Sequence, residues 1–171
     1  MVRVIVLFIT CFVMDNLLVS FLPIQPMFGS YSAIPNVFLM CLCFFTFYDR
    51  GNKVLVFAII FGILYDICYA DLFGIYTCLF PIITFLLQRF VSNSMPVNIL
   101  SMLALFSIVI VIEEWAVYFL VNTMMVTNVS GYAFVKLILF PTLLFNSLVV
   151  LVLYPILKSQ FGRYQKQLEH M

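Results

Sequence analysis

Of the 171 residues in the chain, 65% are hydrophobic, 9% are charged and 20 are Phe. A soluble domain carries about 25% charged residues, so this composition indicates an integral membrane protein. The longest stretch between apolar segments, Pro23 to Ala33, is about eleven residues, which excludes a nucleotide-binding, nuclease or kinase domain. The net charge of +1 says little as a sum, because its placement along the chain matters more.

The apolar residues divide the chain into candidate membrane spans. A helix needs about 20 residues to cross the hydrocarbon core of a bilayer. Six segments approach or reach this length: Val4–Leu22, Ile34–Tyr48, Val54–Tyr69, Leu72–Gln88, Val97–Val121 and Phe134–Leu157. They predict an all-α integral membrane protein with six transmembrane helices in a single domain, residues 1–171.

The first segment resembles a signal peptide, since Arg3 precedes an apolar run. Asp15-Asn16 interrupts that run, however, and no small-x-small cleavage pattern follows before Pro23. We therefore expect an uncleaved first span.

The basic residues predict the orientation, because Lys and Arg concentrate in cytoplasmic loops. With the N-terminus in the cytoplasm, seven of the eight basic residues fall inside: Arg3, Arg50, Lys53, Arg89, Lys158, Arg163 and Lys166. Only Lys136 falls outside. The pattern predicts an even number of spans with both termini cytoplasmic.

Acidic residues within the apolar segments are the strongest functional candidates. An ionised carboxylate at the bilayer centre costs roughly 2.5–3.5 kcal/mol on insertion scales, so it indicates a role in function or assembly. Asp66 stands out because Gly62 precedes it by four residues. The two share a helix face, so another backbone can approach where the acid points.

The other acids fall at comparable depths. Counted from the cytoplasmic edge at 1.5 Å per residue, Asp15 lies about 18 Å deep, Asp66 at nearly the same depth and Glu113-Glu114 about 24 Å deep. Asp71 falls at the outer turn. The acids associated with the spans therefore occupy the outer half of the bilayer or its rim, where Lys136 is the only cation.

Two interpretations of Asp66 remain open. It is either a structural acid, satisfied by hydrogen bonds to Tyr or backbone groups of a neighbouring span, or part of an outward-opening polar cleft for a partner or ligand. Adjacent helical residues point about 100° apart, so we expect only one of Glu113 and Glu114 to face the bundle interior. The other is expected at the interface beside Trp115 and Tyr118.

Other chemistry is less well supported. A proton or cation relay would use such acids, but no intramembrane His or Arg accompanies them and the chain shows no duplicated halves. Asn146 in the last span is expected to form a packing hydrogen bond between helices. The sequence shows no nucleophile triad, metal cluster or phosphate loop, so we expect no catalysis, no cofactor and no nucleic-acid partner.

Two short motifs resemble a known family. The second span opens with Ile34-Pro35-Asn36-Val37, and the next pair of spans carries Gly62-x-x-x-Asp66 followed by Asp71-Leu72-Phe73-Gly74. In this order and spacing they resemble the bacterial rod shape-determining protein MreD family. The stretch Cys68–Asp71 departs from the small Ser-Gly turn that is common there.

The resemblance implies a non-enzymatic component of the cell-elongation machinery in the bacterial cell membrane. Family members associate with the bitopic protein MreC and link MreB to the peptidoglycan synthase RodA and its class B penicillin-binding partner. Their fold is similar to the six-helix substrate-binding (S) components of energy-coupling factor transporters. A small-molecule-binding subunit of such a vitamin transporter is therefore the alternative function.

If the protein is a component of the cell-elongation machinery, we expect an outer cleft around Asp66, Asp15 and Glu113 or Glu114 to dock the transmembrane or juxtamembrane segment of MreC. Pro35, Asn36, Gly62, Asp71 and Gly74 complete the set of partner-binding or structural motif residues. Contact with membrane lipid and a homodimer are also expected of so apolar a surface.

Overall fold

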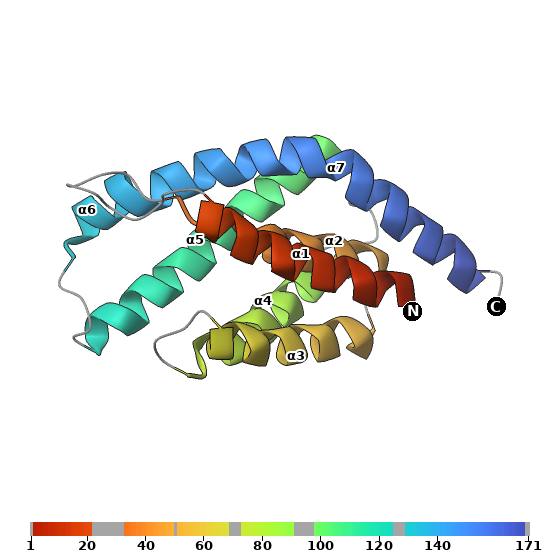
Figure 1. Cartoon of the computed structure of the whole chain (residues 1–171), viewed down its shortest axis with the longest axis horizontal. Helices are drawn as coiled ribbons and strands as arrows, with labels where there is room; N and C mark the ends of the chain where they lie inside the picture. Colours follow the sequence, from red (N-terminus) through yellow and green to blue (C-terminus); the bar gives the residue numbers. More distant parts are fainter. Residues whose placement is uncertain are drawn as a thin grey trace.

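The computed structural model describes residues 2–21, 33–49, 51–68, 73–90, 98–124 and 129–169 (Figure 1), and within these ranges its regular structure is helical throughout. The elements are α1 (Val2–Phe21), α2 (Val37–Tyr48), α3 (Asn52–Cys68), α4 (Ile75–Phe90), α5 (Ile99–Thr123), α6 (Gly131–Phe134), the π-helical turn η1 (Val135–Leu139) and α7 (Phe140–Glu169). The last three follow one another without a break. The described ranges thus form six helices, one for each segment predicted from the sequence.

The helices differ in their ability to cross a bilayer. Within the described residues, three are long and apolar enough by length and composition: α1, α5 and the continuous helix over Gly131–Gln165. Helices α2 and α4 are shorter apolar helices. With 12 residues, α2 is about 18 Å long, well short of a hydrocarbon core of about 30 Å.

Helix α2 is the centre of the molecule. It contacts α1, α3, α4, α5 and α7, and its residues from Val37 to Thr46 are all buried. Aromatic rings pack around it: the centroid of Phe8 on α1 lies 5.6 Å from Phe38 and 5.5 Å from Phe45. The predicted second span, Ile34–Tyr48, is therefore a helix enclosed by its neighbours. Lipid is about as apolar as the protein interior, so van der Waals packing, and not the hydrophobic effect, stabilises α2 among its neighbours.

The last helix contains two prolines with different effects. Before Pro141, the turn η1 has the wider π geometry, in which the Phe140 N–H donates to Val135 O. Pro141 has no N–H and its ring would crowd the carbonyl four residues earlier, so a wider turn accommodates it without ending the helix. Pro155 lies inside α7, which bends over its C-terminal half (Figure 1).

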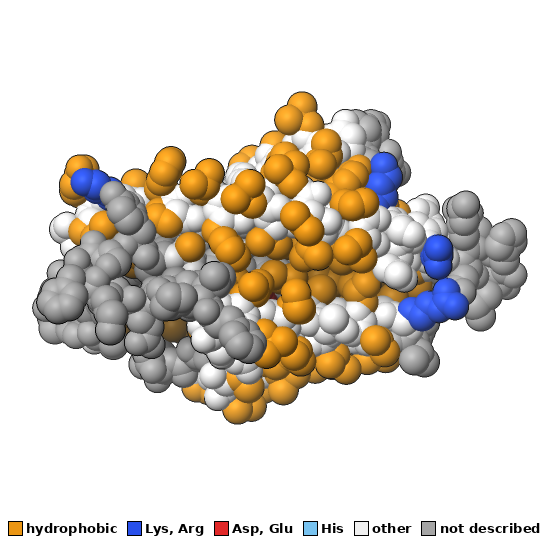
Figure 2. Space-filling model, turned by 45° about the horizontal axis from the view of Figure 1, so that its top comes forward, with side chains coloured by type: hydrophobic (Ala, Val, Ile, Leu, Met, Phe, Trp, Pro, Cys, Tyr) orange, Lys and Arg blue, Asp and Glu red, His pale blue; other side chains and the backbone are white. Residues whose placement is uncertain are grey.

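The C-terminal part of α7 extends beyond the predicted span end at Leu157 and packs back onto the bundle. Phe161 is buried and stacks on Phe45 at 5.5 Å, and the Tyr164 hydroxyl donates to Asp49 Oδ2 at 3.0 Å. Both termini lie at the same end of the molecule (Figure 1). Figure 2 shows one face of the surface, which is mostly apolar, with most of its visible Lys and Arg side chains at that end.

Candidate functional site

Asp15 on α1 caps the N-terminus of α2. Its Oδ1 accepts the Val37 N–H at 2.7 Å, its Oδ2 accepts the Phe38 N–H at 2.9 Å, and the Tyr65 hydroxyl of α3 also donates to Oδ2. The first N–H groups of a helix have no partner within the helix, and the helix dipole favours negative charge at that end. Asp15, only 2% exposed, satisfies both requirements inside the bundle.

Asn146 on α7 completes the same helix start. Its Oδ1 accepts the Asn36 N–H at 2.9 Å, and its Nδ2 donates to Ile34 O at 2.7 Å. The Ile34 N–H donates to the Thr142 hydroxyl at 3.0 Å, and Pro35 has no N–H to satisfy. Every backbone N–H from residue 34 to residue 38 thus has a side-chain acceptor or is absent. Asn146 is predicted to form a hydrogen bond between helices; its observed bonds join α7 to residues 34 and 36, which directly precede α2.

Asp66 on α3 caps α4 in the same manner. It accepts the N–H groups of Tyr76 and Thr77, each at 2.9 Å, and the Thr77 hydroxyl. Gly62 makes this possible, because a Cβ built on it would lie 2.7 Å from Tyr76 O and 2.9 Å from Thr77 Cα. The prediction that another backbone approaches the Gly62–Asp66 face is confirmed. Of the two interpretations of Asp66, this geometry is that of the structural acid.

Gly74 allows the chain to turn into α4. Its φ of 107° lies in the left-handed region, and no atom of the described residues lies within 4 Å of a Cβ added there. Substitution therefore strains the backbone without causing a clash. We expect Gly74→Ala to lower the free energy of unfolding in detergent by about 1–2 kcal/mol, measured by chemical denaturation; an unchanged value would show that the turn relaxes freely.

The structure corrects the prediction for Glu113 and Glu114. Both side chains are buried, at 3% and 6% exposure, whereas only one was expected to face the interior. Helix α5 contacts α2 and α4 as well as α7, so two of its faces are covered and residues 100° apart are both enclosed. Trp115 and Tyr118 pack against Phe134 instead of beside an interfacial acid.

The buried acids form one polar cluster around the starts of α2 and α4. Glu113 lies within electrostatic range of Glu114 and Asp15, and Glu114 neighbours the Asn36 amide. Among the described residues, Glu113 Oε2 has no hydrogen-bond partner. Across the described ranges, His, Cys, Asp and Glu form no group of three or more that could hold a metal ion.

The cluster also contains residues that the sequence did not single out. Tyr65, Thr77 and Thr142 each supply a hydroxyl to a capped helix start. The sequence contained a weak signal for two of them: Tyr65 is adjacent to Asp66, and Thr142 lies one helical turn before Asn146. Asp71 lies outside the described residues.

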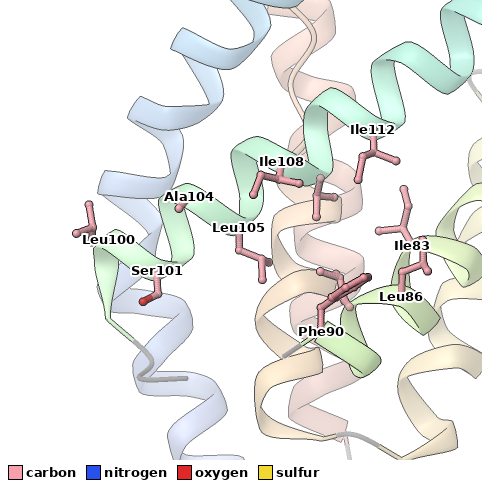
Figure 3. Close-up of a pocket in the computed structure, with 11 residues that line it drawn as sticks. Ile83, Leu86, Phe90, Leu100, Ser101, Ala104, Leu105, Ile108 and Ile112 are labelled. Atoms are coloured by element: carbon pink, nitrogen blue, oxygen red, sulfur yellow. The ribbon is translucent and has the colours of Figure 1, made fainter. Parts of the chain in front are cut away.

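An apolar groove lies between α4 and α5 (Figure 3). It has a volume of about 680 Å³ and is lined by Ile83, Leu86, Leu87, Phe90, Leu100, Ser101, Ala104, Leu105, Ile108, Val109 and Ile112. Ser101 and Ala104 are its small residues, and both lie on α5. None of the described residues that line the groove is charged, in contrast to the polar cluster.

Comparison with known proteins assigns the chain. A family model described as rod shape-determining protein MreD matches residues 1–162. The chain belongs to the MreD family. It is thus a rod shape-determining membrane protein, of a structural family that is not a known enzyme family.

No curated protein matches the chain. No solved structure matches it either, so the likeness to the substrate-binding components of energy-coupling factor transporters stays a prediction. The stretches that resemble the MreD family, Pro35-Asn36 and Gly62 to Asp66, are those that build the capped starts of α2 and α4.

Proposed function

We propose that the protein is a non-enzymatic membrane scaffold of the rod complex, which binds MreC and helps couple MreB to RodA and its class B penicillin-binding partner. The observation that carries this is the match to the MreD family over residues 1–162. The use of Asp15 and Asp66 as helix caps supports the non-enzymatic part of this proposal, because their oxygens accept hydrogen bonds from backbone and hydroxyl groups of the bundle itself.

The burial of the acids supports a different contact surface for MreC. Asp15, Asp66, Glu113 and Glu114 are at most 6% exposed, so docking on an acidic cleft would require the bundle to open. The α4–α5 groove is exposed and apolar, as the transmembrane helix of a bitopic partner would require. Its small residues Ser101 and Ala104 allow a second helix to approach closely. We therefore place the MreC helix in this groove and keep the acids as its structural support.

We further propose that the chain is a multi-pass protein of the bacterial cell membrane with both termini in the cytoplasm. The basic residues at one end of the visible face and the position of both termini at that end support this orientation (Figure 2).

Filling the groove tests the contact with MreC. Ala104 is exposed in the groove, and we expect Ala104→Trp to reduce the yield of MreC co-purified in mild detergent by about tenfold, since overpacking costs about 1–3 kcal/mol. Val152→Trp, on a side chain of α7 that is 68% exposed and outside the groove, is the matched control and should retain wild-type yield. Wild-type yield for both variants, at normal membrane insertion, would refute the groove as the binding surface.

The same purification tests the alternative function. A groove of about 680 Å³ falls within the size range of small-molecule sites. A vitamin-transporter subunit would bring down an ATPase module and bind a small molecule with nanomolar affinity. A scaffold of the rod complex would bring down MreC and neither of these.

A further inference from the structure

A second groove separates α1 from α7. It has a volume of about 640 Å³, and its lining is apolar along most of its length. The apolar lining includes Val6, Leu7, Leu153, Ile156 and Leu157, and the buried side chains of Cys11 and Val37 are part of it. From Arg3 to Met14 the α1 side is about 16 Å long.

Two arginines stand at one end of this groove. Arg3 lies in the first turn of α1 and Arg163 lies near the end of α7, and both side chains are exposed and line the groove. Gln160, one helical turn before Arg163, adds a neutral donor. Among the side chains that the structure describes, no carboxylate forms an ion pair with either guanidinium. The described ion pair, between Lys53 and Asp49, involves no residue of this groove.

We propose that this groove binds an anionic phospholipid, with an acyl chain between α1 and α7 and the headgroup phosphate at Arg3 and Arg163. Charge complementarity selects this occupant: an uncharged helix would fill the apolar part and leave two guanidiniums without a counter-ion. Basic pockets between membrane helices suit anionic headgroups, and guanidinium forms paired hydrogen bonds with phosphate. The described lining of the α4–α5 groove contains no charged side chain, so the two surfaces differ in chemistry.

Native mass spectrometry of the full-length protein in mild detergent tests this proposal, with phosphatidylglycerol as the probe and phosphatidylcholine for comparison. Phosphatidylglycerol is expected to bind the wild-type protein about 25-fold more tightly than phosphatidylcholine, because each of the two arginines contributes about fivefold. The double variant Arg3→Gln/Arg163→Gln should lose the preference. Arg89→Gln removes an exposed arginine on α4 and should leave the preference for phosphatidylglycerol unchanged.

A second pair of variants tests the groove itself. Thr10→Trp fills the groove from α1 without altering its charge, and should weaken binding of both lipids; Ile9→Trp, on the neighbouring exposed position outside the groove, should not. An equal loss of the preference for phosphatidylglycerol in Arg89→Gln and in the double variant would show that general surface charge causes it, and would overturn the proposal. Retained preference in the double variant, or unchanged binding in Thr10→Trp, would overturn it as well. Unfolding midpoints matched to wild type confirm that each variant is folded.

Discussion

Gly62→Ala is expected to lower the free energy of unfolding by about 2 kcal/mol, although alanine favours helices more than glycine does. The added Cβ would lie 2.7 Å from Tyr76 O and 3.1 Å from Thr77 N. These are backbone atoms, which a side-chain rotation does not relieve, so α3 and α4 must move apart. That movement also lengthens the hydrogen bonds from Tyr76 and Thr77 to Asp66. Chemical denaturation in detergent measures the change.

A second helical glycine provides the control. In the part of the chain that the structure describes, no atom lies within 4 Å of a Cβ added at Gly162 on α7, so Gly162→Ala should leave stability unchanged or raise it by up to about 1 kcal/mol. Equal effects at the two positions would show that helix propensity, and not the contact with α4, governs Gly62.

Asp15→Leu is expected to cost about 3 kcal/mol or more, because each buried donor left without an acceptor costs about 1–3 kcal/mol. Three donors depend on this carboxylate: the N–H groups of Val37 and Phe38 and the Tyr65 hydroxyl. Leucine is similar in size, so the loss reports on hydrogen bonding more than on volume. The free energy of unfolding of the purified protein is the measurement.

Asn16→Leu is the matched control, since it replaces the adjacent polar residue on the exposed side of α1 and should change stability little. The pair also separates structural support from partner docking. If Asp15 acts only as a cap, the remaining folded Asp15→Leu protein binds MreC with wild-type affinity. Reduced affinity of well-folded protein would restore the acidic cleft as a contact surface, and wild-type stability of Asp15→Leu would contradict the capping role.

The positions of the helices followed from composition and local pattern. Each of the six predicted segments is a helix, and the ends of the first five lie within three residues of the prediction; the third, Val54–Tyr69, is observed as Asn52–Cys68. The sixth, Phe134–Leu157, is observed as a longer helix over Gly131–Glu169. Such segments are recognisable because an apolar run in lipid satisfies its backbone hydrogen bonds only as a helix. The depth of the acids was also informative, since Asp15, Glu113 and Glu114 do come together.

The length of an apolar segment did not reveal whether its helix would face lipid or other helices. Ile34–Tyr48 was expected to be a span, yet α2 begins only at Val37 and is enclosed by five other helices. Hydropathy does not distinguish a helix facing lipid from one facing protein, because the two environments are almost equally apolar. Glu113 and Glu114 show the same limit, since spacing fixed the angle between them but not how many helices would cover α5.

By itself, the sequence determined a helical membrane protein with the MreD motifs, and it identified Gly62 and Asp66 as a face for close approach. Only the tertiary structure decided what approaches that face. Along the chain, Asp15 is 22 and 23 residues from the two N–H groups that it accepts, and Asp66 is 10 and 11 residues from its two. A backbone N–H buried in the apolar interior needs an acceptor. The packing of the helices decides which side chain lies close enough to be that acceptor. The same packing left the α4–α5 and α1–α7 grooves open, and no local pattern in the sequence marks either one.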